Sequence, residues 1–181
     1  VKAMIMDHIT YFKNIIEQSI LVDDKPILQG KLYELYPEPS TFIASLPCAV
    51  IGHRIGTAKQ TGGIDTSKVT DTDITLTREM IQTTHPYQID FYSKTINDFI
   101  DDNNILTQFI REVTKKPCYL CNDGRIIMIH IGAFGLLDEP ELIEQGPYKA
   151  FCQVTIEDAV YGTTIVPRIT TIQFDEGGVY E

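Results

Sequence analysis

The sequence predicts an α+β fold in which a mixed, mainly antiparallel β-sheet is packed by amphipathic helices. Two stretches, residues 4–21 and 94–114, place apolar residues at helical spacing. Several shorter segments combine β-branched and aromatic residues with an alternating pattern. The chain has 181 residues, 43% apolar and 22% charged, which is the composition of a globular protein large enough for one core. We therefore expect a single α+β domain over residues 1–181.

The first predicted helix, over residues 4–21, carries one apolar stripe with polar side chains on its other sides. The stripe consists of Ile5, Ile9, Phe12, Ile16 and Ile20. Two interpretations stay open for it. Either the stripe packs on the core of the same chain, or it docks on a neighbouring subunit.

Strands are predicted over residues 27–35 and 47–55, because the segment between them, residues 36–40, contains two prolines in a turn-like composition. Residues 57–73 are rich in Thr, Gly, Ser, Lys and Asp, and this composition predicts a long loop. Such a loop either becomes ordered on assembly or has no regular structure. Residues 74–82 and 86–92 then predict two strands joined as a hairpin.

The most strongly amphipathic segment is the predicted helix over residues 94–114, for which Ser93 is the expected N-cap. Its acidic residues fall in the first half and its basic residues near the end, as the helix dipole favours. The polar run at residues 101–104 is able to bend or split this helix.

A second hairpin is predicted after Pro117, with strands over residues 118–121 and 125–131. The intervening Asn-Asp-Gly at 122–124 favours a tight turn, because these residues tolerate positive φ. The second strand is apolar on both faces, which predicts a central position in the sheet.

The last third is predicted to contain a loop or one helical turn at 138–147 and a strand over 148–157. A final strand over 163–174 is expected to pair back across residues 159–162. Pro167 has no N–H to donate, so its strand is expected at a sheet edge or a bulge.

The formal net charge is −10, which disfavours tight binding to a phosphate backbone. No apolar run approaches the length of a membrane span, and no secretory signal is recognisable. These features predict an intracellular protein. Four cysteines are too few for a disulfide scaffold of this size, so we expect reduced thiols.

The one local pattern typical of metal or redox chemistry is Cys118-Tyr119-Leu120-Cys121. A zinc site needs two more ligands, and the candidates do not have the usual ligand spacing. These candidates are Cys48, Cys152, His130 and His85. A redox pair of this kind normally opens a helix, whereas this one precedes a hairpin turn. Buried strand cysteines are the simpler interpretation.

Other side chains give no catalytic pattern. Cys48 and His53 lie five residues apart on one predicted strand, so they point to opposite faces and do not form a nucleophile–base pair. His130 is expected to be a hydrogen-bonded core or surface histidine. The sequence contains no phosphate-binding loop, dinucleotide fingerprint or nucleophile elbow. We therefore predict no catalytic, cofactor-binding or metal-binding residue, and a protein that is not an enzyme.

The segment from Ile74 to Lys116 resembles the neck and tail-terminator proteins of tailed bacteriophages, which are head–tail joining proteins. In those proteins a strand with the pattern Gln-hydrophobic-Asp-hydrophobic-aromatic runs into a helix, as in QIDFYS at residues 88–93. The segment from Tyr148 to Phe174 is similar to their C-terminal sheet. The resemblance covers roughly residues 74–174, and QIDFYS is its most specific part.

The resemblance implies a virion structural protein that is assembled in the host cytoplasm. It implies a homo-oligomeric ring, commonly a hexamer, that caps the tail tube and joins it to the head connector. Its partners would be copies of itself, the tail tube protein and connector or adaptor proteins. DNA would pass through the lumen without specific binding, which the net negative charge suits. The N-terminal helix and residues 57–73 depart from the family pattern.

Six residues are candidate subunit contacts because of their positions. They are Arg54, Lys59, Lys68, Arg78, Asp90 and Tyr92. An Arg of one subunit that meets an Asp of the next is a common way to fix ring geometry. Solvated surface side chains are the alternative for each. Two other functions also stay open, namely a metal-binding or redox domain at Cys118 and Cys121, and a monomeric adaptor that binds one protein through its N-terminal helix.

Overall fold

A computed structural model describes residues 2–60, 64–101, 103–137 and 147–167. Contacts divide the chain into two compact units. Unit 1 is formed by residues 1–58 and 83–158, and unit 2 by residues 59–82 and 159–181. Three strands contribute residues to both units, so the expectation of a single domain stays a prediction. None of the described helices is long and apolar enough to span a membrane.

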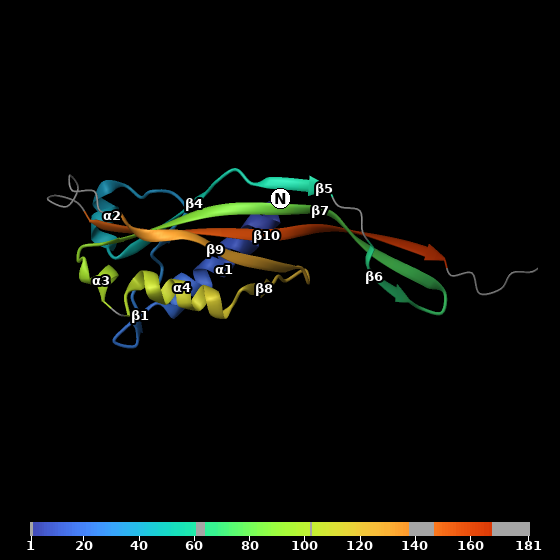
Figure 1. Cartoon of the computed structure of the whole chain (residues 1–181), viewed down its shortest axis with the longest axis horizontal. Coiled ribbons are helices and arrows are strands. Elements are labelled where there is room, and N and C mark those ends of the chain that lie inside the picture. The colour runs from blue at the N-terminus through green and yellow to red at the C-terminus, as the bar shows by residue number, and fades with distance from the viewer. Residues whose placement is uncertain (1, 61–63, 102, 138–146, 168–181) are drawn as a thin grey trace, which may run out of the picture. The chain divides into compact units, whose positions relative to one another are not determined.

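The elements confirm an α+β fold with a mainly antiparallel, mixed sheet (Figure 1). In chain order they are α1 (Lys2–Ser19), β1 (Leu21–Val22), β2 (Lys25–Pro26), β3 (Leu32–Tyr33), α2 (Pro39–Ser45), β4 (Cys48–His53), β5 (Thr57–Gln60), β6 (Ile64–Val69), β7 (Asp73–Ser93), α3 (Asn97–Ile100), α4 (Ile105–Lys115), β8 (Cys118–Leu120), β9 (Ile126–Leu137) and β10 (Tyr148–Pro167).

The main sheet has the strand order β3-β4-β7-β10-β9-β8, and β5 and β6 also pair with β7. The pairing of β3 with β4 is parallel. The pairings of β4 with β7, β6 with β7, β8 with β9 and β9 with β10 are antiparallel. Unit 1 therefore presents β3 and β4 at one edge of the sheet and β8 at the other.

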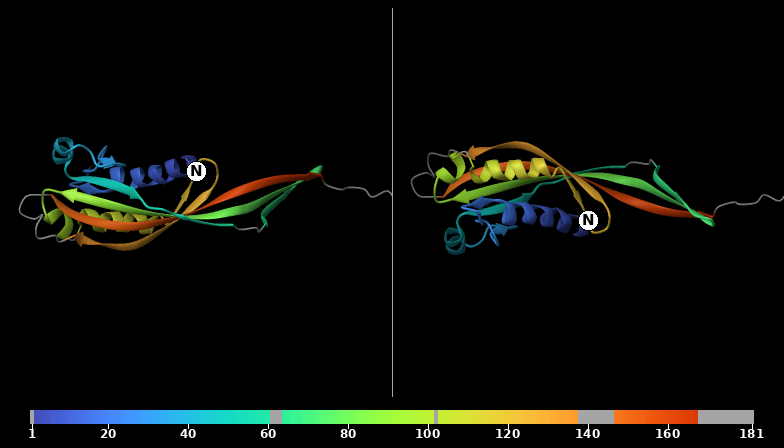
Figure 2. Two further views of the ribbon diagram at one scale, coloured as in Figure 1. Left: turned by 90° about the horizontal axis from the view of Figure 1, so that it is seen from above. Right: turned by 90° about the horizontal axis from the view of Figure 1, so that it is seen from below.

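Helices α1 and α4 cover one face of the sheet in unit 1, and Figure 2 shows them from two sides. Phe12 of α1 contacts the ring of Tyr87, and Phe109 of α4 contacts that of Phe91. Tyr87 and Phe91 are four residues apart on β7, so both point to this helical face. All four rings are buried. The apolar stripe predicted for the N-terminal helix thus packs on the core of its own chain, with Ile9 and Ile16 also buried.

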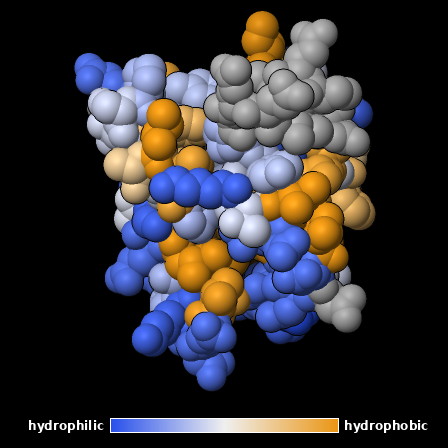
Figure 3. Space-filling view, turned by 90° about the vertical axis from the view of Figure 1, so that its left-hand side faces the viewer, coloured by the Kyte–Doolittle hydropathy of each residue, from blue (hydrophilic) through white to orange (hydrophobic). Residues whose placement is uncertain are grey.

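The opposite face of the sheet in unit 1 is partly covered by α2. Cys48 and Val50 of β4 and Tyr92 of β7 are buried there and form a second, smaller cluster with Phe42 of α2. The rings of Phe42 and Tyr92 lie 4.9 Å apart in an edge-to-face arrangement. Around the end of unit 1 that carries α2 and α3, hydrophobic and hydrophilic side chains are interspersed on the surface (Figure 3).

Among the described residues, unit 2 consists of β6 with the parts of β5, β7 and β10 that fall in its ranges. Among its residues whose side chains are described, only Ala159 is buried. Several large apolar side chains are exposed, and they come from β6, β7 and β10. They are Val69, Met80, Ile81, Val160, Tyr161, Ile165 and Val166. Unit 2 therefore has no core of its own among the described residues.

Two segments predicted as broken are continuous strands. The predicted hairpin over 74–92 is wrong, because β7 runs without interruption through Thr83-Thr84-His85. Two β-branched threonines favour strand, and no residue there supplies the positive φ of a tight turn. The predicted break at 159–162 is also wrong, since β10 is one strand to Pro167. The predicted partner residues 168–174 lie outside the described residues.

The predicted loop over residues 57–73 is wrong for most of its length, because β5 and β6 form there. The register aligns Val69 with Ile74 and Ser67 with Leu76. Hydrogen bonds close the actual turn, in which the Thr70 N–H donates to the Asp73 carbonyl at 2.8 Å. Threonine has a high strand propensity once a partner strand is available. The composition of the segment predicted a loop because it gives no information about that partner.

The helix predicted over 94–114 is two helices, α3 and α4. The Asn104 side chain accepts a hydrogen bond of 2.8 Å from the Thr107 N–H, so Asn104 is the N-cap of α4. The polar run at residues 101–104 therefore splits the predicted helix, which was one of the two outcomes expected for it. Ser93 does not cap a helix directly. It ends β7, and its Oγ accepts from the Thr95 N–H.

The predicted turn after Pro117 is confirmed, and Gly124 has a φ of +86° there. The strand that follows, β9, lies between β10 and β8, as expected for a strand inside the sheet. Only one of its faces is buried, however. Ile127 and Ile129 are in the core, whereas Ile126 and Met128 are exposed by 59% and 47%. The strand predicted over residues 27–35 is mostly wrong, because only the two residues of β3 form a strand there, whereas the strand predicted over 47–55 is confirmed as β4.

Candidate functional site

A cleft of about 390 Å³ opens in unit 1 beside strand β4. Its walls come from the chain that follows β3, from β4 and the residue after it, and from β7. The lining residues are Glu34, Leu35, Tyr36, Val50, Ile51, Gly52, His53, Arg54, Gln88 and Asp90. Leu35 and Tyr36 are exposed by 83% and 62%. The cleft is therefore open to partners and combines apolar with charged groups.

Strand alternation places the polar residues of β7 together. Gln88, Asp90 and Tyr92 are two residues apart, so their side chains share the face that α2 partly covers. Their partners on β4 are Gly52, Val50 and Cys48 in that order. Gly52 has no side chain, which leaves room above β4 next to Gln88.

Asp90 is buried and holds several polar contacts. Its Oδ1 accepts from Gln88 Nε2 at 2.8 Å, and its Oδ2 accepts from Tyr36 OH at 3.1 Å. Lys149 Nζ of β10 lies 3.0 Å from the same Oδ2. Arg54 Nη2 donates in turn to the Gln88 side-chain oxygen. These bonds satisfy the Asp90 carboxylate inside its own subunit.

Tyr36 joins this polar group to the small apolar cluster. Its hydroxyl lies 2.9 Å from that of Tyr92, and Lys149 Nζ lies 5.5 Å from the centre of the Tyr92 ring. Burial and the hydrogen bond to Tyr92 raise the pKa of Tyr36 above its usual value. Its hydroxyl therefore stays protonated at neutral pH and donates to Asp90. These contacts hold the segment after β3 against β7.

The structure brings three of the six candidate contact residues together at this cleft. Arg54 and Asp90 line it, and Tyr92 lies beside them. Lys59 and Lys68 are exposed on β5 and β6, and Arg78 pairs through its backbone with Ile64. These three belong to unit 2. Their role as subunit contacts stays a prediction.

Sequence reasoning missed Tyr36, Gln88 and Lys149 as members of this site. The alternation Gln88-x-Asp90-x-Tyr92 was itself a signal that three polar side chains share one face. Tyr36 lies in a segment assigned to a turn, and Lys149 is distant in the sequence. Neither could be connected to Asp90 without the strand order.

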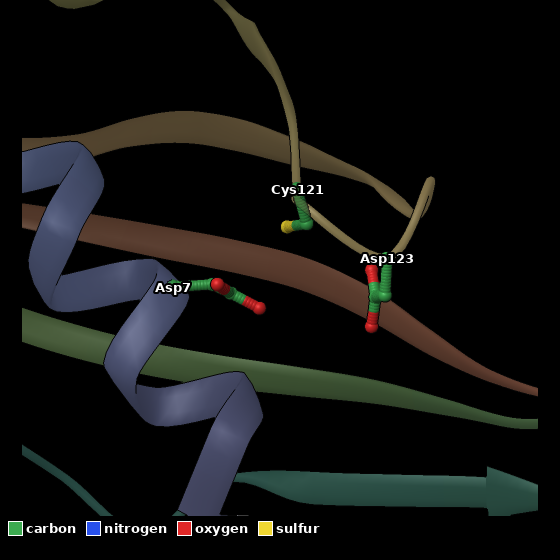
Figure 4. A group of neighbouring side chains, drawn as sticks. All are labelled: Asp7, Cys121 and Asp123. Carbon is green, nitrogen blue, oxygen red and sulfur yellow. The ribbon is translucent and has the colours of Figure 1, made fainter.

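A second polar cluster lies between α1 and the β8–β9 turn, and Figure 4 shows part of it. The Arg125 guanidinium binds three carboxylates. Its Nη2 lies 2.7 Å from Asp7, its Nε lies 2.6 Å from Asp123, and its Nη1 contacts Asp158. The Arg125 side chain is 12% exposed and that of Asp158 is fully buried. This arrangement ties α1, the turn and β10 together.

Three histidines extend the second cluster, although the sequence showed no pattern among them. His8 is buried, and its ring nitrogens lie 2.8 Å from Tyr87 OH and 3.2 Å from Asp158 Oδ2. The His85 ring lies 5.0 Å from that of His8 and 5.7 Å from that of His53. Both ring nitrogens of His85 are buried without a hydrogen-bond partner among the described residues. Burial and the neighbouring histidines lower the pKa of His85.

The cysteines do not assemble into the zinc or redox site considered from the sequence. All four are free, and only Cys118 is exposed. Cys121 instead lies near Asp7 and Asp123, with the ligand atoms of all three within 4.8 Å of one another (Figure 4). Arg125 already binds both carboxylates. Burial and Asp7 raise the pKa of Cys121 to about 11, which disfavours the thiolate that metal binding and thiol exchange need.

Cys48 and His53 lie on opposite faces, as predicted. Cys48 belongs to the cluster under α2, and the His53 ring lies 4.9 Å from that of Tyr87 on the helical face. His130 is a surface histidine, 51% exposed and 3.7 Å from Glu157. No model of a known protein family matches the sequence, and no curated protein matches it.

Proposed function

We propose that this protein is a structural subunit of the bacteriophage neck and tail. In this proposal it is a tail terminator that assembles into a ring, caps the tail tube and joins it to the head connector. Head–tail adaptor and baseplate component are related roles within the same class. The proposal rests on the resemblance of residues 74–174 to that family and on one structural observation about unit 2.

That observation is the lack of a core in unit 2. Its strands expose large apolar side chains, including Met80 at 53% and Ile165 at 65%, and bury only Ala159 among the described side chains. Small sheets of this kind need a hydrophobic face that is covered by something else. Exposed apolar surface on several adjacent strands is typical of a surface that is buried on assembly. Copies of the same chain are the occupant we propose, because closed symmetric rings are the common solution for such subunits.

Charge supports the same function. A net charge of −10 disfavours adhesion of DNA to a ring through which it must pass. The polar group at Asp90 is satisfied within the subunit, so it stabilises the strand that carries QIDFYS rather than supplying a free charge. In this proposal the QIDFYS pattern acts first on the fold of the subunit.

The alternative of a metal or redox protein has less support. Cys118 is exposed on the edge strand β8. Cys121 is buried just after that strand, near the Arg125 guanidinium. Metal analysis of the purified protein separates the two functions, because stoichiometric zinc would favour the alternative.

The ring itself is tested by absolute mass from light scattering and by negative-stain imaging of the same fraction. We expect a ring with a central hole and a mass of about 120 kDa, which is six copies of 20.5 kDa. A monomer at every concentration would instead favour an adaptor that binds one protein partner.

A further inference from the structure

Both edges of the unit 1 sheet have backbone groups without a strand partner among the described residues. Such groups could form the contacts between copies in the proposed ring. The strand β3 is only two residues long and pairs with Ala49 and Val50 of β4. Residues 51–53 of β4 therefore have no strand neighbour on that side within the described chain. At the other edge, β8 has β9 as its one neighbour. Open edges are places where a further strand adds by backbone hydrogen bonds.

The register shows which backbone groups of β4 point outward. The Arg54 N–H donates to the Pro86 carbonyl of β7, so Arg54, Gly52 and Val50 direct their backbone groups toward β7. The alternate residues point away from β7. Ala49 is one of these, and its N–H already bonds the Lys31 carbonyl. Ile51 and His53 are the next two. The parallel pairing of Tyr33 with Val50 directs the Ile51 N–H to Tyr33, so the Ile51 carbonyl and both backbone groups of His53 are left facing the cleft side of the strand.

The same reasoning applies to β8. The Cys121 N–H donates to the Arg125 carbonyl, and the Pro117 carbonyl accepts from the Ile129 N–H. Residues 117, 119 and 121 therefore direct their backbone groups toward β9. Cys118 and Leu120 direct theirs outward. Each edge thus has two outward residues at a spacing of two, Cys118 and Leu120 on β8 and Ile51 and His53 on β4.

The segment after β3 carries acidic side chains and the residues before β8 carry basic ones, although Arg54 also lines the cleft. Glu34 lines the cleft next to β4, and Glu38 lies a few residues further along, both exposed. Lys115 and Lys116, also exposed, directly precede β8. Lys115 has an ion pair with Glu112 at 2.7 Å, whereas no ion pair of Lys116 is found among the described residues. Leu120 adds an apolar side chain that is 66% exposed, and the cleft offers Leu35 to receive it.

We propose that β8 of one copy pairs with residues 51–53 of β4 in the next copy, so that neighbouring sheets continue into one another around the ring. The inference rests on the proposed ring and names the surfaces that form it. The contact joins two different surfaces of the chain, which is the heterologous type of interface that generates rings. Complementary edge charges favour this pairing over contact between two identical edges.

Native Cys118 allows a direct test by cross-linking. Arg54→Cys places a second thiol at the exposed end of β4, on the same face of the sheet as Cys118, while the other three native cysteines are buried. Under mild oxidation we expect a ladder of covalent oligomers on a non-reducing gel. The matched controls are Arg54→Cys combined with Cys118→Ser, and Thr107→Cys on the exposed start of α4. Neither control should give the ladder.

A backbone variant tests the hydrogen bonds. Leu120→Pro removes an outward N–H without removing a bond to β9, and Leu120→Val keeps that N–H. We expect Leu120→Pro to reduce the mass from the ring to 20.5 kDa with an unchanged circular dichroism spectrum. Leu120→Val should retain the ring. Glu34→Lys should weaken assembly, and Lys116→Glu added to it should restore assembly.

The outcomes separate the inference from the ring proposal. A ring that forms normally in Leu120→Pro, with no ladder from Arg54→Cys, overturns the edge pairing and leaves the ring proposal intact. A ladder from Arg54→Cys, even where the free protein is monomeric, supports the pairing. A monomer without any ladder at millimolar concentration overturns both.

Discussion

The two parts of strand β7 differ sharply although they are one continuous strand. In unit 1, Tyr87, Ile89 and Phe91 are almost completely buried, whereas Met80 and Ile81 in unit 2 are exposed by 53% and 38%. The first part packs on rings from α1 and α4, and the described residues of unit 2 include no helix. An apolar strand is thus buried only where helices are available to cover it.

The largest effect expected from this difference is on the core of unit 1. Phe109→Ala removes a fully buried ring that contacts Phe91, and we expect a loss of about 4 kcal/mol in the free energy of unfolding. Urea unfolding followed by circular dichroism measures it. A loss below about 1 kcal/mol would mean that the helical layer does not carry the stability of unit 1.

The next effect is expected at the buried guanidinium. Arg125→Met removes the guanidinium that contacts the fully buried carboxylate of Asp158, and we expect a loss of about 3 kcal/mol in the free energy of unfolding. The matched control is Arg111→Met, which removes an arginine that is 50% exposed, and should change stability by less than about 0.5 kcal/mol. Equal effects of the two variants would contradict the structural role of Arg125.

Acid should weaken unit 1 through the histidines. The pKa values of His85 and His53 are lowered in the folded state, chiefly by burial, so the unfolded chain binds protons more readily. Their contribution to stability is present above the ordinary value near 6.5 and is lost as the pH falls below it. Melting temperatures measured from pH 8 to pH 5 should fall. His85→Phe should make that fall shallower, and His130→Asn should leave its slope unchanged.

A smaller effect is expected at the start of α4. Asn104→Ala removes the side chain that caps the Thr107 N–H, and the expected loss is about 1 kcal/mol. Asn104→Ser keeps a capping oxygen and should lose only a few tenths of a kcal/mol. If both variants lose the same free energy of unfolding, the Asn104 cap does not define the start of α4.

The smallest effect is expected in unit 2. Met80→Ala should change the free energy of unfolding of the free chain by less than about 0.5 kcal/mol, because the side chain is exposed. The same variant should weaken the assembled ring. A loss above about 2 kcal/mol in the free chain would show that unit 2 has a core after all.

The sequence predicted the elements that carry their own local signal. The apolar stripe of α1 and the Asn-Asp-Gly turn before β9 were found, because helical periodicity and positive φ depend on neighbouring residues only. The lengths of β7 and β10 were not found. Thr83-Thr84-His85 is neither a strong strand nor a strong turn signal, and its state is decided by pairing with other strands.

The polar cleft shows the same limit. Gln88, Asp90 and Tyr92 were recognised as one pattern, yet their partners Tyr36 and Lys149 come from segments 54 and 59 residues away from Asp90 along the chain. The acids that surround Arg125 are equally dispersed. In a chain with 25 acidic residues, nothing local distinguishes the three that meet one guanidinium.

The Arg125 cluster has a consequence for how this sequence can vary. The arginine is joined to Asp7 across 118 residues and to Asp158 across 33, and Asp123 lies two positions before it. Loss of the arginine leaves three neighbouring negative charges, and loss of a single acid leaves the others in place. We therefore expect that, among related sequences, an apolar residue at position 125 is accompanied by neutral residues at positions 7 and 158, so that these distant sites change as one group.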